Sequence, residues 1–216
     1  KIVAKYLNAS AAEVFFTSCG TESNNMVIKQ AVANLGVKRI ISSPTEHHCV
    51  LHTVKTEGSK GVAVDYVQVN AKGDVDVAHL ETLLATQPET KTLVSLMHAN
   101  NEIGTLLNIQ QVGEICAKYG ALFHSDSVQT VAHYPMDVQA TKVHFLSGSA
   151  HKFHGPKGIG FVYINGNNAI KPLIEGGAQE RNMRAGTENV VGIVGLGKAL
   201  ELWMTEGEQY RNHIES

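Results

Sequence analysis

The sequence predicts an α/β protein with a largely parallel sheet that is covered by helices on both faces. Short β-branched and aromatic runs alternate with amphipathic stretches along the 216 residues, which is the pattern of such a sheet. Polar residues gather directly after five of the apolar runs. Because the carboxyl ends of parallel strands meet at one edge, where ligands bind, we expect a functional site there.

Seven segments have the composition of strands. Most are apolar throughout, as expected for strands that are buried on both faces, and "GIGFVYI" and "EVFFTS" are typical of them. The expected strands are residues 13–18, 38–43, 61–69, 91–98, 121–126, 142–149 and 158–164.

Helices are expected between most of these strands and at both ends of the chain. Apolar residues recur at helical spacing in "DVAHLETLLAT", and a glycine, Gly36, is well suited to end the helix that follows the first strand. The expected helices are residues 1–8, 22–36, 47–57, 76–86, 108–120 and 188–205.

Composition excludes several classes of function. The net charge of −2 gives no basis for binding nucleic acid or an acidic membrane surface. The longest apolar stretch, residues 190–204, is interrupted by glycines and charged residues, so we expect no membrane span. The three cysteines form neither a disulfide framework nor a CxxC zinc motif, and we expect a reducing, cytoplasmic setting.

Metal binding is not expected either. The histidines between His144 and His154 have the spacing H-x6-H-x2-H, which matches no zinc pattern.

Three strand ends carry groups that are suited to an anion or a flat ring. Gly20 and Thr21 join a strand to a helix N-terminus, which can hold a phosphate, although threonine is also a common N-cap. His47 could stack on a ring or move protons, or simply begin a helix. Asp126 follows a buried strand, where an acid needs a partner: a protonated ring nitrogen, or the hydrogen bonds of a helix cap.

Two amides complete this group. Gln129, three residues after Asp126, can lie on the same side of a first helical turn. Asn100 could donate a hydrogen bond to a ligand oxygen or cap a turn.

Lys152 carries the most specific indication. A desolvated lysine at a strand end can act as a nucleophile toward a carbonyl group, whereas a loop lysine is usually solvated. Lys157 lies in the turn sequence "GPKG" and is expected to be solvated. The whole set matches the needs of pyridoxal 5′-phosphate (PLP): a phosphate cup, a stacking histidine, an acid for the ring nitrogen and a lysine for the aldehyde.

Six ordered motifs closely resemble those of the cysteine desulfurases and the related selenocysteine lyases. Both are PLP enzymes of fold type I, in the class V aminotransferase group. The matching stretches run from about Glu13 to Val191: "FTSCGTESNN", "TEHHCV", "MHANNEIGTL", "HSDSVQ", "SGSAHKFHGPKGIG" and "GGAQERNMRAGTEN". The resemblance implies a three-layer α/β/α large domain with a mostly parallel seven-stranded sheet.

The resemblance also implies roles for individual residues. Lys152 would be the catalytic Schiff-base lysine, and His47 would stack on the ring and assist proton transfer. The remaining cofactor-binding residues would be Asp126 at the ring nitrogen, Gln129 and Asn100 at the ring hydroxyl, and Gly20, Thr21, Ser149 and His151 at the phosphate. Thr187 would reach the phosphate of a neighbouring subunit, which implies a homodimer.

The implied activity is conversion of L-cysteine to L-alanine. The sulfur would pass as a persulfide to a sulfur acceptor or to an iron–sulfur scaffold protein, for cluster or thio-cofactor synthesis. Selenocysteine lyase activity, or a catalytically inert cofactor-binding domain, are the alternatives.

Residues 1–216 are expected to be the PLP-binding large domain of a longer protein. The N-terminal segment of the family and its C-terminal small domain, with the sulfur-accepting cysteine and the substrate-binding arginine, find no match here. Cys19 is expected to be a packing variant in the phosphate cup. Cys49 and Cys116 are expected to be buried structural thiols.

Overall fold

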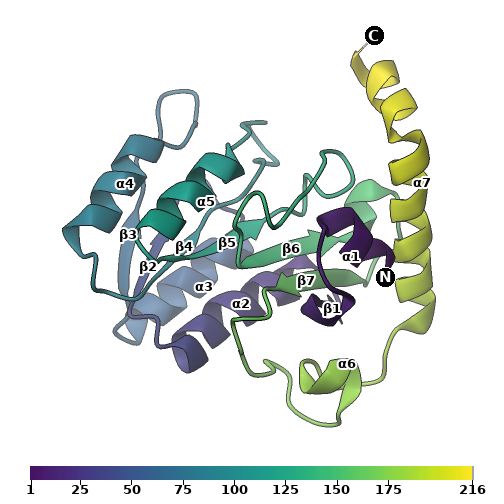
Figure 1. The fold of residues 1–216 in the computed structure, drawn as a ribbon, viewed down its shortest axis with the longest axis horizontal. Helices are drawn as coiled ribbons and strands as arrows, with labels where there is room; N and C mark the ends of the chain where they lie inside the picture. The colour runs from purple at the N-terminus through teal and green to yellow at the C-terminus, as the bar shows by residue number, and fades with distance from the viewer. Residues whose placement is uncertain (216) are drawn as a thin grey trace.

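The centre of the structure is one seven-stranded sheet (Figure 1). The computed structural model describes residues 1–215. The strands are β1 (Val14–Thr17), β2 (Arg39–Ser42), β3 (Ala63–Tyr66), β4 (Thr92–Ser95), β5 (Leu122–Asp126), β6 (Phe145–Ser149) and β7 (Gly160–Ile164). Their order in the sheet is β1-β7-β6-β5-β4-β2-β3.

Helices cover both faces of this sheet (Figure 1). They are α1 (Ile2–Leu7), α2 (Gly20–Leu35), α3 (His48–Ser59), α4 (Val77–Thr86), α5 (Ile109–Lys118), α6 (Gln179–Asn182) and α7 (Val190–Glu215). Two short 3-10 helices, η1 (Ala11–Glu13) and η2 (Ala150–Phe153), precede β1 and follow β6.

The two faces have separate hydrophobic cores, because successive strand residues point to opposite sides of a sheet. Leu122 belongs to the core beneath α2 and α3. Phe123, the next residue of β5, belongs to the core beneath α1, α4, α5 and α7. The strands are therefore buried on both faces, which explains why they are apolar throughout.

The direction of the strands determines at which edge of the sheet the site lies. Strands β2 to β6 pair in parallel, whereas β7 is antiparallel to both β6 and β1. The carboxyl ends of β1, β2, β4, β5 and β6 therefore lie at the same edge. The antiparallel strand instead brings its first residue, Gly160, opposite Thr17 at the end of β1. A Cβ at Gly160 would lie 2.9 Å from the Cys19 backbone, so only glycine fits there.

The predicted elements agree closely with these. Each of the seven strands lies within a predicted segment, and the α/β fold with a mostly parallel sheet is confirmed. The final helix is longer than expected, since α7 reaches residue 215. The sequence did not predict α6 or the two 3-10 helices, of which η2 carries Lys152. No helix described within residues 1–215 combines the length and apolar character that crossing a membrane requires.

Candidate active site

A cleft of about 240 Å³ lies at the carboxyl edge of the sheet. Its walls come from the segments that follow β1, β2, β4, β5 and β6, as expected for a doubly covered sheet. Of the ten predicted site residues, the cleft brings together eight: Gly20, Thr21, His47, Asp126, Gln129, Ser149, His151 and Lys152.

The N-terminus of α2 forms the end of the cleft that suits an anion. Gly20 and Thr21 are the first two helical residues, and amide groups at these positions have no acceptor within the helix. A Cβ at Gly20 would lie only 2.4 Å from Cγ2 of Val128, so the glycine lets the helix end approach the segment after β5. The arrangement can bind a phosphate.

Ser149 and His151 face each other at the end of β6. The Ser149 hydroxyl and the His151 Nδ1 are 2.9 Å apart. Burial, together with the positive charges of Lys152 and Lys157, holds the pKa of His151 below its usual value. A neutral imidazole beside a hydroxyl offers hydrogen bonds rather than charge, and both side chains line the cleft.

Asp126 is a buried carboxylate with amide partners. Its Oδ2 accepts a hydrogen bond of 2.6 Å from Nδ2 of Asn24, and its Oδ1 accepts one of 3.1 Å from the Val128 amide. Burial raises the pKa of Asp126, despite these bonds and the influence of His47. Within the described chain no Lys or Arg pairs with Asp126. A protonated ring nitrogen in the cleft would supply the missing positive partner.

His47 stands at the N-terminal end of α3 and is exposed. Its Nδ1 accepts a hydrogen bond of 3.1 Å from the Cys49 amide and lies 2.9 Å from the Cys49 Sγ. Because Nδ1 is an acceptor, the ring proton belongs on Nε2. The flat face of this ring is available to stack on a ligand.

Lys152 lies directly after β6, within η2, and lines the cleft. The expectation that it is desolvated is wrong, because its side chain is exposed. The 3-10 turn carries it beyond the buried strand end, where the Lys152 carbonyl accepts a hydrogen bond of 3.0 Å from Nε2 of His133. Lys157 is exposed as expected and does not line the cleft.

The Asn100 side chain bonds to the backbone of neighbouring segments rather than facing the cleft. Its Nδ2 donates to the Thr45 carbonyl at 2.7 Å, and its Oδ1 accepts from the amides of Glu102 and Ile103. The assignment of Asn100 to the cleft is therefore wrong. Its neighbour Asn101 is exposed and lines the cleft in its place.

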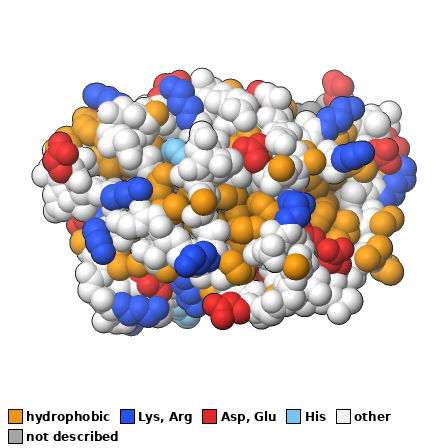
Figure 2. Space-filling model, turned by 60° about the horizontal axis from the view of Figure 1, so that its bottom comes forward, with side chains coloured by type: hydrophobic (Ala, Val, Ile, Leu, Met, Phe, Trp, Pro, Cys, Tyr) orange, Lys and Arg blue, Asp and Glu red, His pale blue; other side chains and the backbone are white. Residues whose placement is uncertain are grey.

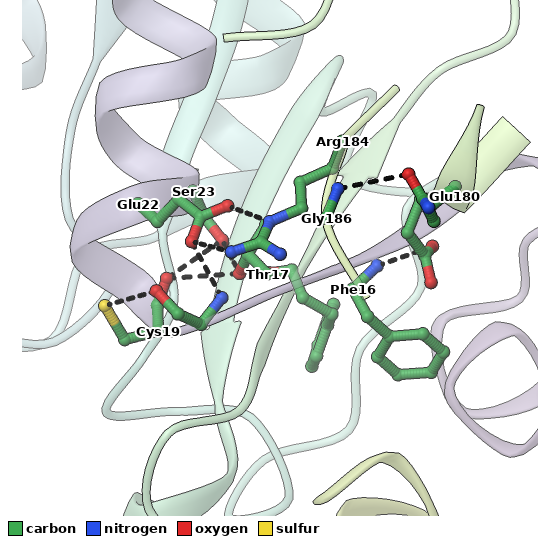
Figure 3. Close-up of polar contacts among 11 residues, drawn as sticks. Phe16, Thr17, Cys19, Glu22, Ser23, Glu180, Arg184 and Gly186 are labelled. Atoms are coloured by element: carbon green, nitrogen blue, oxygen red, sulfur yellow. Dashed lines mark hydrogen bonds and ion pairs between the residues drawn. The ribbon is translucent and has the colours of Figure 1, made fainter. Parts of the chain in front are cut away.

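Thr187 does not lie in this cleft. It lines a second one, together with Phe16, Glu180 and Arg184. Figure 3 shows how α2 is tied to this region: Nε and Nη2 of Arg184 contact the two carboxylate oxygens of Glu22, at 2.9 and 3.2 Å. Burial opposes ionisation of Glu22, but the hydrogen bonds from Arg184 and Ser18 outweigh it, so its pKa lies below the usual value.

The cysteines differ in part from expectation. Cys116 is buried, as predicted, but Cys49 is only partly buried and lines the cleft beside His47. Burial raises the pKa of the Cys49 thiol to about 11. Cys19 lines the anion-binding end of the cleft, where the sequence analysis placed it. Asn24 and Asn101 also line the cleft but were not predicted from the sequence. They lie in the motifs "FTSCGTESNN" and "MHANNEIGTL", close to residues that were predicted.

The histidines of the H-x6-H-x2-H series do not gather into a metal-ligand cluster in the described residues. No three His, Cys, Asp or Glu side chains in residues 1–215 are grouped so that they could hold an ion. His144, the first histidine of the H-x6-H-x2-H series, instead accepts a hydrogen bond of 3.1 Å from the Phe123 amide.

The cleft fits PLP. One end has free helix amides for a phosphate, and the floor has a buried carboxylate without a cation. An exposed histidine and an exposed lysine lie at its walls. These four features match the phosphate, ring nitrogen, ring face and aldehyde of that cofactor.

Comparisons with known proteins agree with this chemistry. A family model described as "Aminotransferase class-V" matches residues 1–215. The chain is 48% identical to cysteine desulfurase IscS of Dictyoglomus turgidum over 206 residues, which cover 94% of the chain and 52% of that protein. It is 47% identical to cysteine desulfurase IscS of Methanosarcina thermophila, over 97% of the chain and 52% of that protein. The chain thus spans about half the length of these curated relatives.

Two solved structures are also similar. One is named "NIFS-LIKE PROTEIN", with a TM-score of 0.93 and 44% identity, covering 99% of this chain and 59% of the other. The second, "SspA in complex with cysteine", has a TM-score of 0.86 and 37% identity, covering 98% of this chain and 63% of the other.

Proposed function

Because the chain belongs to the class V aminotransferase family, whose model matches residues 1–215, we propose that it is the PLP-binding part of a cysteine desulfurase. The whole enzyme would convert L-cysteine to L-alanine and deliver the sulfur as a persulfide. The observation that carries the proposal is the meeting of Lys152, His47 and Asp126 in one cleft beside a free helix N-terminus. The names of the relatives and of the structure that holds cysteine support the substrate.

PLP, when bound, supplies an electron sink for the bonds at the substrate's α-carbon. The α2 N-terminus, Ser149 and His151 would hold its phosphate, and Asp126 would pair with the ring nitrogen. As an anion, the Asp126 carboxylate keeps a proton on that nitrogen, since an opposite charge nearby favours the cationic form. Gln129 and Asn101 lie at the wall of the cleft, and we assign them to the ring hydroxyl.

Lys152 would both hold the cofactor and move the proton. Its Nζ is the group that would attach the cofactor at the aldehyde carbon. As a free amine, the same Nζ would accept the proton from the substrate's α-carbon. His47 has its ring proton on Nε2, so it can donate a hydrogen bond while it stacks on the cofactor.

The sulfur is passed to a thiol that we place outside these residues. A raised pKa makes a cysteine a poor nucleophile at neutral pH, because the thiolate is the reactive form. This argues against Cys49, whose pKa is about 11, and against the buried Cys116, whose pKa burial also raises. Cys19 occupies the anion-binding end. The persulfide would then serve an iron–sulfur scaffold protein or thio-cofactor synthesis, in a reducing cytoplasmic setting.

We also propose a homodimer in which Thr187 reaches the phosphate of the second copy. Thr187 is exposed and lies just before three exposed valines at the start of α7, of which Val191 is 84% exposed. Figure 2 shows hydrophobic side chains gathered across the middle of one face of the molecule. Apolar surface of this kind favours a partner.

A turnover assay with PLP tests the function. The whole enzyme is mixed with PLP and L-cysteine, and alanine and sulfide are measured in the presence of a thiol reductant. Both products are expected, and they should be absent when Lys152 is replaced by Ala. Binding of PLP without turnover would favour the inert cofactor-binding domain. Faster turnover of L-selenocysteine would favour a selenocysteine lyase.

A further inference from the structure

Glu46 is a buried acid that adjoins the site but has no part in the chemistry above. It immediately precedes His47, and only 5% of its surface is exposed. Its Oε1 accepts two hydrogen bonds of 2.9 Å, one from the Met97 amide and one from the Ser43 hydroxyl. Its Oε2 has no partner in the described chain.

These hydrogen bonds hold the loop that carries His47 against the segment that follows β4. The loop, residues 43–47, connects β2 to α3, while Met97 follows β4 in the neighbouring part of the sheet. A second bond joins the same two segments, from Asn100 Nδ2 to the Thr45 carbonyl at 2.7 Å. His47 is thus held at the cleft by two bonds from the segment after β4, and one of them depends on the Glu46 carboxyl.

The surroundings of Glu46 favour its neutral form. No Lys, Arg or His nitrogen in residues 1–215 forms an ion pair with it. The ionisable groups that influence it or adjoin it are Asp126 of β5, Cys49 of α3 and its neighbour His47. Burial, and to a lesser degree the Asp126 charge, raises the pKa of Glu46 to about 8. Two buried carboxylates cannot both ionise without a large cost.

We propose that Glu46 is a positioning residue that holds the His47 loop closed as a neutral acid, so that opening of the loop is coupled to loss of its proton. The bond from Met97 to Oε1 persists in the neutral acid, because the proton resides on the unpartnered Oε2. When the loop opens, the carboxyl reaches water and ionises. Access to the cleft beneath His47 therefore depends on pH.

The direction of this dependence follows from the two pKa values. In the closed loop the pKa is about 8, and in an open loop it returns to about 4.5. The open form therefore gains stability as the pH rises above 4.5. Its population increases by about tenfold per pH unit up to about pH 8 and then levels off.

Hydrogen exchange of the Met97 amide measures the opening directly, because that amide donates to Glu46. Rates are recorded by NMR between pH 5 and pH 9 and divided by the rates of the unfolded peptide at each pH. The His98 amide is the internal control, since it donates to the Asp126 carbonyl at 2.9 Å and not to Glu46. Glu46→Gln is the matched variant, because its amide keeps the acceptor and cannot ionise.

In the wild-type protein, Met97 protection is expected to fall by about tenfold per pH unit to about pH 8, while His98 changes less. In E46Q, Met97 protection should stay level over this range, and in Glu46→Ala it should be lost throughout. Level protection in the wild type, a fall in E46Q equal to that of the wild type, or a parallel fall at His98 would each overturn the proposal. The comparison of wild type with E46Q decides the question even if E46A does not fold.

The exchange experiment needs no PLP. A negative result therefore removes the pH-dependent loop without affecting the proposed cofactor chemistry. Only the statement that the loop controls access to a cofactor rests on the proposed function.

Discussion

Gly20→Ala is the substitution that most directly tests the anion-binding end of the cleft. The added Cβ would lie 2.4 Å from Cγ2 of Val128, whereas carbon atoms normally approach to about 3.5–4.0 Å. The Val128 side chain, the start of α2 or the segment after β5 must therefore move by about 1 Å or more. Where the start of α2 moves, the amides of Gly20 and Thr21 move with it.

The expected cost follows from two opposing terms. Overpacking of this kind costs about 1–3 kcal/mol, while replacing Gly by Ala stabilises by about 0.4–1 kcal/mol through the unfolded chain. We expect a net loss of about 1–2 kcal/mol in the free energy of unfolding. Because each 1.4 kcal/mol changes an equilibrium constant tenfold, a displaced phosphate cup should weaken PLP binding by about tenfold or more.

Urea unfolding and PLP titration measure both effects. Gly197→Ala, in α7, is the matched control, because its nearest neighbour, Ile2 Cδ1, lies at an ordinary 3.5 Å; it should be neutral or stabilising. Val128→Ala removes the clashing methyl group, so the G20A/V128A double variant should recover about 1 kcal/mol or more relative to the sum of the single changes. Full stability in G20A, or no recovery in the double variant, would refute the reasoning.

Three further outcomes are expected. Asn101→Ala should weaken PLP binding with little loss of stability. Asn100→Ala should instead lower the urea midpoint, because Asn100 makes three hydrogen bonds to the backbone. The reverse pattern would restore the assignment of Asn100 to the ring hydroxyl. Arg184→Lys keeps the charge but loses the two-point contact with Glu22, which ties residues 176–189 to α2. Protease cleavage of this segment should therefore become about tenfold faster. An unchanged cleavage rate would refute this. Burial raises the pKa of Asp126. The wild type without cofactor should therefore lose stability relative to Asp126→Asn as the pH rises through that raised value, which urea unfolding from pH 4 to pH 8 measures. The opposite trend would mean that the carboxylate is stabilised as an anion.

The strands and most helices are predictable because they follow from local patterns. Seven apolar runs are long enough for strands and too short for helices, and their alternation with helices implies parallel pairing. The direction of β7 was not predicted, since composition does not encode strand direction. The ten residues between β6 and β7, including η2, form a short connection, and short connections join antiparallel neighbours.

The parts that were missed depend on contacts between distant segments. In α6, Glu180 and Arg181 have positive φ values of 44° and 57°, which no local preference predicts. They are held there by β1, because the Phe16 amide donates to Glu180 and Arg181 donates to the Val14 carbonyl at 2.6 Å.

The candidate site was predictable by motif but not by single residue. The sequence "HANNEIG" identifies a polar strand end, yet only the turn geometry decides that Asn100 faces the loop and Asn101 the cleft. The exposure of Lys152 likewise depends on the turn η2, which begins where the buried strand stops.

Borohydride reduction followed by peptide mapping tests the central claim most directly. The chain is incubated with PLP, reduced and digested, and the modified lysine is located by mass spectrometry. Reduction should fix PLP to Lys152, in the cleft, and leave Lys157, which is also exposed and lies five residues away, unmodified. Labelling of both lysines to the same extent, or of neither, would contradict a PLP site built on Lys152.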